Sequence, residues 1–250
     1  MKPHLLAFGG SVPTTSTFAA IPTITDTYAT KTSAGMLLPQ SAKALMAYVR
    51  GVNVNDARMN SPSIRAIGPP SMWPFDTAAN PPNLPPLIRF KECGPIVPAM
   101  DALNVEVSTI VAVAADAQAL ILFGDGPPQP DRRSSRTIKL TGAGTGVVNA
   151  WVATDFILAQ SLPAGRYAVV GFAAFGTGLL AARLIFNDQP ERPGVPAQQA
   201  FAEYDDSDFR YGAFGEWGTF QNTALPTVEV LAYAANSAQT FFMDIVPVGR

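Results

Sequence analysis

Hydrophobic and polar positions alternate in short segments from Asp101 to the end of the chain, and turn-forming residues end each segment. Eight segments are rich in β-branched and aliphatic residues, which favours strands over helices. In the seventh, apolar residues such as Val230 and Leu231 occupy both faces of the alternation, so we expect both faces to be covered, as in a packed β-sandwich. The predicted strands are residues 104–114, 118–123, 136–140, 147–159, 166–174, 179–186, 227–235 and 239–248.

A long excursion, residues 187–223, separates the sixth predicted strand from the seventh. Short strands in this number with one long connection are typical of an all-β fold, the eight-stranded jelly roll or a related Greek-key sandwich. A larger sandwich is the alternative. It would recruit strands from residues 17–54, where residues 17–25 are β-branched and residues 44–54 begin as a possible helical turn and end as strand.

The first hundred residues follow a different pattern, because they hold fourteen of the 23 prolines. Nine of these fall within residues 69–98, and each fixes φ and removes an amide donor, which excludes regular helix or central strand there. Apolar residues such as Met72, Trp73, Phe75 and Ile88 argue against a solvated linker. We therefore predict two parts: an extended, proline-rich N-terminal arm with some strands (1–100), whose strap lies on a core or on a neighbour, and the sandwich (101–250).

Charged residues make up only 14% of the chain, against about 25% in typical soluble domains. Two interpretations remain open: a bland polar surface, or a surface covered by neighbouring subunits. The net charge of −2 gives no field that attracts a polyanion, and the first fifty residues contain only four cations. We expect no sequence-specific nucleic-acid binding and no basic genome-binding arm.

Catalytic and metal-binding residues are scarce. Cys93 is the only cysteine and His4 the only histidine, which excludes an intrachain disulfide and a two-histidine metal site. We expect His4 to lie in a mobile N-terminus and the protein to be neither an enzyme nor a cofactor-binding protein. Clustered oxygens at Asp205, Asp206 and Asp208 are weak candidates for calcium ligands, because the rest of an EF-hand loop is missing.

Residues 201–220 combine seven aromatic side chains with five acids, which suits a contact surface or a loop folded back over its own sandwich. Arginines after Asp131 form the only dense basic cluster, which either contacts phosphate or an acidic neighbour or is a solvated loop. Together with the proline-rich strap, these segments give the predicted subunit-interface residues, which are Trp73, Phe75, Arg132, Arg133, Tyr204, Phe209, Tyr211 and Trp217.

Two segments superficially resemble motifs of other protein classes, a membrane-spanning helix and a phosphate-binding loop. Residues 167–182 are uncharged, but a membrane-spanning helix needs about 20 residues, and three glycines favour two buried strands in a hairpin that bends near residues 175–178. Residues 142–146 resemble a phosphate-binding loop, but neither a Lys-Ser/Thr pair nor a helix follows them. A β-turn is the better interpretation, and we expect no membrane span.

The stretches Leu162-Pro163-Ala164-Gly165-Arg166-Tyr167-Ala168-Val169-Val170-Gly171 and Gln239-Thr240-Phe241-Phe242-Met243-Asp244-Ile245-Val246-Pro247-Val248 resemble the strand-edge turns and closing strand of viral jelly-roll capsid proteins, particularly those of small tailless icosahedral phages. The resemblance is one of architecture and covers residues 101–250. It implies a major capsid subunit that assembles with itself, as a trimer or pseudo-hexamer, into an icosahedral shell with other virion proteins, made in the host cytoplasm. The alternatives are a carbohydrate- or receptor-binding β-sandwich, and a hydrolase that uses Asp205, Asp206 or Asp208.

Overall fold

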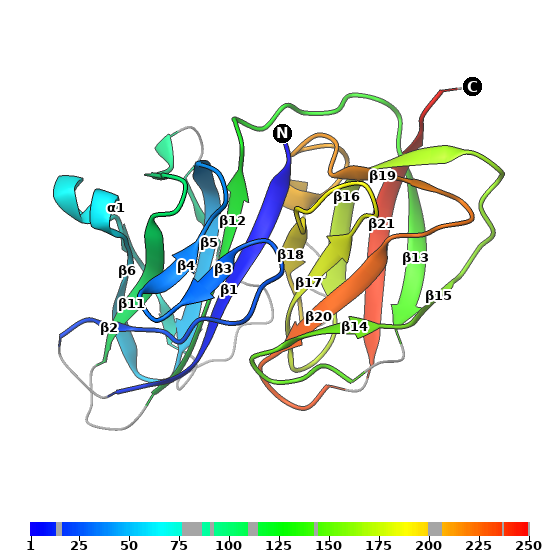
Figure 1. The fold of residues 1–250 in the computed structure, drawn as a ribbon. Helices are drawn as coiled ribbons and strands as arrows, with labels where there is room; N and C mark the ends of the chain where they lie inside the picture. Colours follow the sequence, from blue (N-terminus) through cyan, green and yellow to red (C-terminus); the bar gives the residue numbers. More distant parts are fainter. Residues whose placement is uncertain are drawn as a thin grey trace. The chain divides into compact units, whose positions relative to one another are not determined.

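The structure is a computed structural model that describes residues 1–13, 17–76, 87–90, 93–109, 115–142, 145–199, 207–236 and 238–249. The described chain is all-β, as predicted, and is built from antiparallel sheets. It divides into two compact units, which we call the N-terminal unit (Leu6–Asp125) and the C-terminal unit (Met1–Leu5 with Gly126–Arg250). Figure 1 shows both units with most of their strands labelled.

The N-terminal unit contains two sheets. In the first, β1 (Pro3–Val12), β12 (Ala115–Gly124), β5 (Ala42–Gly51) and β10 (Ile96–Val97) lie in that order, and the short strands β8 (Phe75–Asp76) and β9 (Ile88–Arg89) also pair with β5. In the second, the order is β3 (Thr30–Thr32), β4 (Gly35–Leu37), β11 (Ala102–Thr109), β6 (Val54–Asn60) and β7 (Ser71–Met72), with β2 (Ala19–Ala20) on β11. Side chains such as Phe8, Met59 and Phe123 fill one core between these sheets.

The helix α1 (Pro62–Ile67) follows β6 because its start and its end are both specified locally. The Ser61 hydroxyl accepts a hydrogen bond from the Ile64 N–H (3.2 Å), and Pro62 supplies a fixed φ at the first helical position. Gly68 ends the helix with φ 99°, a conformation that favours glycine. Within the described residues, no helix is long and apolar enough to cross a membrane.

The C-terminal unit also contains two sheets. The first has the order β15 (Phe156–Leu158), β13 (Arg136–Gly142), β21 (Gln239–Pro247), β16 (Arg166–Phe175) and β19 (Gly218–Gln221). The second has the order β14 (Trp151–Thr154), β20 (Thr227–Ala232), β17 (Leu179–Ile185) and β18 (Gly194–Pro196). Phe172 and Phe241 stack within the core at 5.9 Å between ring centroids. The 3-10 helix η3 (Ser207–Phe209) lies in the long connection before β19.

The main strands of the two units are ordered in the same way. In each unit the opening strand pairs with the closing strand, β1 with β12 and β13 with β21. The path β1-β12-β5-β10 has its counterpart in β13-β21-β16-β19, and the path β4-β11-β6-β7 in β14-β20-β17-β18. The chain therefore uses one arrangement of eight strands twice.

All eight predicted strand segments contain strands, and the one at residues 147–159 is divided between β14 and β15. The predicted boundary was at residue 100. In the structure, the chain passes from one compact unit to the other between Asp125 and Gly126. Residues of the predicted arm form β1, β5 and β6, which pair with the segments after residue 100: β12 lies between β1 and β5, and β6 lies beside β11. The first hundred residues thus supply ten of the twelve described strands of the N-terminal unit and are not a separate arm.

The described part of the proline-rich strap lies along its own unit. It forms β7, which pairs with β6, and β8, β9 and β10, which all pair with β5. Each piece has two residues, which fits the rule that proline is confined to strand edges and breaks. Residues 77–86 of the strap lie outside the described residues.

The prediction of two buried strands at residues 167–182 is confirmed, but the predicted hairpin is wrong. β16 and β17 are both buried, and the chain turns between them at Gly178, where φ is 80°. They belong to different sheets, so the turn carries the chain across the sandwich instead of pairing the two strands. A crossing of this kind leaves the same alternation in the sequence as a hairpin.

The prediction of a mobile tail at His4 is also wrong. His4 lies in β1 and is 2% exposed, and its Nδ1 accepts a hydrogen bond from the Arg192 N–H (3.0 Å). Leu5 N–H donates to the Arg192 carbonyl (2.8 Å). The apolar run from Leu5 to Phe8 is buried in strand, which fixes the histidine beside it.

Candidate interaction surface

A buried ion pair anchors the long connection of the C-terminal unit to its sheet. Arg210 follows η3, Asp244 lies in β21, and the two side chains are 1% and 0% exposed. Arg210 Nε donates to one carboxylate oxygen (2.6 Å), and another guanidinium nitrogen donates to the second oxygen (2.8 Å), which is the two-pronged geometry typical of strong arginine–carboxylate pairs.

Two further donors complete the site. The Thr137 hydroxyl donates to Asp244 (2.6 Å), and so does the Tyr211 backbone N–H (2.9 Å). Burial by itself raises the pKa of Asp244, but the hydrogen bonds from Arg210, Thr137 and Tyr211 outweigh burial and hold this pKa below its ordinary value of 3.8. The carboxylate therefore stays ionised inside the protein.

β16 makes room for the pair at a β-bulge. Its pairing with β21 shifts register between Val169 and Gly171, directly opposite Asp244. A Cβ at position 171 would collide with the Asp244 carboxylate and with the backbone of Arg210. Only glycine at this position allows the connection to approach the sheet so closely.

The anchored connection turns sharply and displays Tyr211. Tyr211 has φ 54°, and Gly212 and Gly215, with φ 81° and 82°, complete the turn. A residue other than glycine in this conformation costs about 1–2 kcal/mol. Gly212 N–H donates to the Val170 carbonyl (2.8 Å), which fixes the turn on the bulged strand. Tyr211 is consequently 59% exposed although its own N–H is tied to a buried carboxylate.

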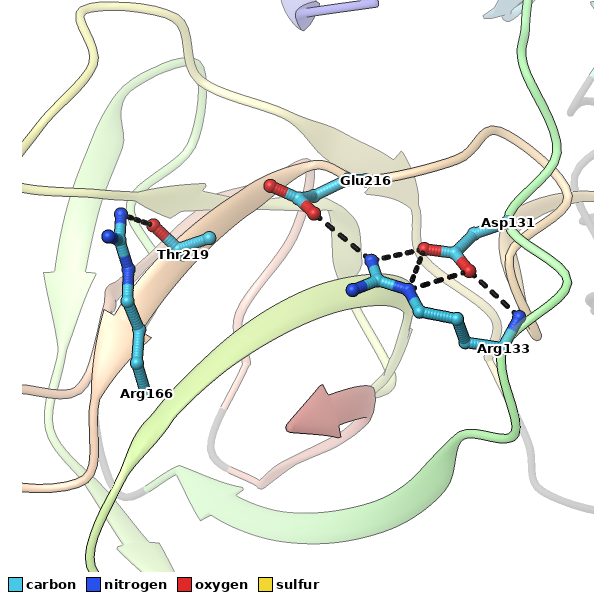
Figure 2. A network of polar contacts seen from close by, with 5 residues as sticks. All are labelled: Asp131, Arg133, Arg166, Glu216 and Thr219. Carbon is cyan, nitrogen blue, oxygen red and sulfur yellow. Dashed lines mark hydrogen bonds and ion pairs between the residues drawn. The ribbon is translucent and has the colours of Figure 1, made fainter. Parts of the chain in front are cut away.

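A second ionic network lies at the surface beside this turn. Figure 2 shows Arg133 directed toward both Asp131 and Glu216, with its Nε 2.9 Å from an Asp131 oxygen and a terminal nitrogen 3.1 Å from Glu216. The Arg133 hydrogen bond lowers the pKa of Asp131, and the Asp131 carboxylate raises the pKa of Arg133. Exposed pairs of this kind each contribute about 0–1 kcal/mol.

The backbone joins the same two segments. Asp131 N–H donates to the Gly212 carbonyl (2.8 Å), and Gly212 and Gly215 approach the carbonyls of Asp131 and Gln129 so closely that a Cβ at either would collide. Arg133 thus binds acids of its own unit, as in the solvated-loop interpretation, and Arg132 beside it is exposed.

The predicted interface residues divide into buried and exposed groups. Trp217 is 1% exposed, and its backbone N–H donates to the Val169 carbonyl (2.8 Å). Phe209 is buried and stacks on Phe214 at 5.7 Å. The prediction that these two aromatics face a neighbouring subunit is wrong, because they fill the core of their own unit. Phe75 is half-buried in β8.

The acidic cluster is described only in part. Asp208 lies in η3, whereas Tyr204, Asp205 and Asp206 lie outside the described residues. Within the ranges that the structure describes, no three His, Cys, Asp or Glu side chains lie together in a group that could hold a metal ion.

In the N-terminal unit, four large apolar side chains are at least 62% exposed, three of them at or beside α1 and the fourth, Trp73, after β7; we call the four together the α1 surface. Ile67 ends the helix, Ile96 lies in β10, which packs against it, and Met100 precedes Asp101. The Asp101 carboxylate accepts hydrogen bonds from the Ser61 hydroxyl (2.5 Å) and the Ser63 N–H (3.1 Å), which places Met100 near the start of α1. Trp73 follows β7 and is 84% exposed.

Sequence reasoning identified Trp73 and Tyr211 but missed the ion pair and the other members of the α1 surface. Arg210 is the only base among residues 201–220, a signal that it has a particular acidic partner. Nothing in the sequence indicates that this partner is Asp244, 34 residues away. Nothing in the sequence distinguishes Ile67 and Ile96 from buried aliphatic residues, and only the fold shows that both are exposed.

Comparison with known proteins gives little beyond the fold. No protein-family model matches the chain, and no curated protein matches it. Among solved structures, the crystal structure of the major capsid protein P2 from bacteriophage PM2 matches with a TM-score of 0.25 and 10% sequence identity, over 99% of this chain and 98% of that one. The resemblance to phage capsid proteins that the sequence suggested is therefore present as a weak, fold-level similarity. At this TM-score it carries no argument about function.

Acid should weaken the C-terminal unit through Asp244. A carboxyl whose pKa is lowered by folding stabilises the folded state above its unfolded pKa, and this contribution is lost as pH falls through the lower, folded value. We expect the free energy of unfolding, measured by urea denaturation, to fall as pH decreases below about 4. An Asp244→Asn variant should lose less of its remaining stability over the same range. An equal loss in both proteins would contradict this assignment.

Proposed function

We propose that each unit is an eight-stranded jelly roll. Lettered B to I in chain order, the strands of a jelly roll form two sheets, B-I-D-G and C-H-E-F. With β1 as B, the N-terminal paths β1-β12-β5-β10 and β4-β11-β6-β7 follow this order, and with β13 as B, so do β13-β21-β16-β19 and β14-β20-β17-β18. The remaining short strands are additions at edges and corners.

The chain is a structural virion protein, a major capsid subunit that associates with copies of itself into a closed shell and has no catalytic role. The observation that carries this proposal is the α1 surface. Exposed large apolar side chains in this number suit a surface that binds a partner, and Trp73 and Ile67 are each 84% exposed. The low share of charged residues, 14%, agrees with a surface that is largely covered in the assembly.

The apolar area that the α1 surface could bury is of the order needed for a contact between subunits. A large aromatic side chain covers about 150–250 Å² when buried, and a stable interface removes about 800 Å² from each partner. Ile67, Ile96 and Met100, and separately Trp73, would supply the apolar contacts of such interfaces, and polar neighbours would form the rims. In the C-terminal unit, Tyr211 is the candidate contact, because an anchored, strained backbone holds an aromatic ring in solvent.

Trp73→Ala should reduce assembly without unfolding the subunit, since the ring makes no part of either core. The expected result is a loss of about tenfold or more in apparent association constant, the size typical of an aromatic at the centre of an interface. Light scattering across a concentration series measures the association, and circular dichroism checks the fold.

Ile157→Ala is the matched control. Ile157 is also a large exposed apolar side chain, but it belongs to the C-terminal unit and is not part of the α1 surface. Its replacement should leave association within about twofold of wild type. If Trp73→Ala unfolds the protein, or if both variants associate as strongly as wild type, the α1 surface is not the interface.

A further inference from the structure

A small pocket opens on the surface of the C-terminal unit, away from the ion pair. Its volume is about 190 Å³, and it lies among β16, β19 and the segments that follow β17 and β19. Phe186, Phe220 and Pro226, all buried, form its apolar lining. A Cβ on Gly218 would lie only 2.6 Å from the Phe186 ring, so glycine at this position lets that ring lie against β19.

Opposite charges meet at its mouth. Arg166 and Asp188 are both half exposed, and their charged atoms lie 3.6 Å apart. Arg166 donates to the Thr219 hydroxyl (2.6 Å), a contact drawn in Figure 2, and that hydroxyl lies 3.2 Å from an Asp188 oxygen. The three side chains form one polar group with no net charge.

A positive, a negative and a hydroxyl group side by side favour a neutral ligand that both donates and accepts hydrogen bonds. An anion would face Asp188 and a cation would face Arg166, so neither gains from the site as a whole. A sugar hydroxyl both donates and accepts, and therefore suits an arginine, a carboxylate and a hydroxyl held side by side. Asn187 and Gln221, exposed beside them, supply amide groups of the same dual character.

Size and apolar lining agree with this choice. Pockets for drug-sized molecules begin at about 300 Å³, so a pocket of about 190 Å³ accommodates a single ring. The C–H face of a pyranose can pack on Phe220 and Pro226 while its hydroxyls reach the polar group at the mouth. We infer that this pocket binds one neutral sugar ring, either a free monosaccharide or the terminal residue of a glycan.

Saturation-transfer difference NMR tests this inference on the full chain, whether or not it is assembled. The probes are glucose, galactose, mannose and N-acetylglucosamine, with gluconate and glucosamine as charged counterparts of glucose and a galactose-terminated oligosaccharide as the glycan arm. The expected result is saturable binding of at least one neutral sugar, with a Kd on the order of millimolar, as befits so small a ligand. The charged counterparts should bind more weakly.

Asp188→Ala and Thr219→Val should each weaken this binding about tenfold, because each removes a hydrogen-bonding partner of the ligand. Asp155→Ala is the matched control: Asp155 is an exposed acid of the same unit outside the pocket, and its loss should change the Kd by less than about twofold. Unchanged circular dichroism confirms that each variant is folded. The inference is overturned if no neutral sugar binds saturably, if gluconate or glucosamine binds at least as tightly as glucose, or if Asp188→Ala binds as wild type does.

Discussion

Asp244→Ala is expected to destabilise the C-terminal unit by about 3–5 kcal/mol, the range for breaking a buried ion pair by removing one partner. The substitution leaves the Arg210 guanidinium buried with its opposite charge gone, and it also removes the acceptor for Thr137 and for the Tyr211 N–H. Urea denaturation monitored by tryptophan fluorescence measures the change, because Trp217 lies in the same core.

Glu216→Ala is the control, because it breaks an ion pair at the surface instead of a buried one. Glu216 pairs with Arg133 at the surface, where its side chain is 45% exposed, and its loss should cost less than about 1 kcal/mol. A double variant, Arg210→Met with Asp244→Leu, should recover part of the stability lost in Asp244→Ala, because no unpaired charge is left inside. Equal effects of Asp244→Ala and Glu216→Ala would show that the buried pair is not the anchor.

Trp217→Ala is expected to cost about 3–5 kcal/mol, as large-to-small changes of core aromatics do. The indole is 1% exposed, so its removal leaves a cavity inside the C-terminal unit. Thermal unfolding followed by circular dichroism measures the loss. Trp217→Phe, which keeps an aromatic ring, should retain most of the stability.

Trp217→Ala and Trp73→Ala should differ in their effect on stability, because Trp217 is buried and Trp73 is exposed. Both tryptophans are predicted from sequence as interface residues, but only Trp73 is exposed in the folded chain. Trp73→Ala should therefore leave the unfolding free energy within about 0.5 kcal/mol of wild type. If Trp217→Ala proves as stable as wild type and reduces association instead, its placement in the core is contradicted.

Strand positions after residue 100 could be predicted from sequence because alternation and turn residues are local signals. The eight segments there all contain strands, and residues 227–235, predicted from their alternation, contain β20. The partners of those strands could not be predicted in the same way. β12 pairs with β5, about seventy residues earlier, and no local pattern records such a distant contact.

The first hundred residues were harder to interpret for a physical reason. β1 contains Gly9 and Gly10, which usually end a strand, and Gly10 has φ 147°, a conformation that side chains other than glycine rarely adopt. The strap resembles a free arm because its prolines forbid long strands, yet two-residue pieces suffice to pair with β5. The composition correctly indicated an irregular chain, but it did not indicate that this chain pairs with strands of its own sheets.

The candidate surface was predictable only in part. Aromatic residues on long loops suggested contacts, and Tyr211 is indeed exposed, whereas Phe209 and Trp217 are buried. The difference lies in the turn, since the positive φ at Tyr211 and the hydrogen bond from its N–H to Asp244 decide which aromatic faces solvent. Those features depend on a residue in another strand, and the sequence of the loop does not contain them.

Sedimentation velocity of the wild-type chain beside Trp73→Ala, at matched concentrations, tests self-assembly through the α1 surface most directly. The subunit has a mass of 26.4 kDa, so a closed shell of many copies sediments far ahead of a monomer. The expected result is a fast, homogeneous boundary for wild type that shrinks in Trp73→Ala in favour of folded subunits. A wild-type chain that remains a monomer at every concentration would contradict the proposed function.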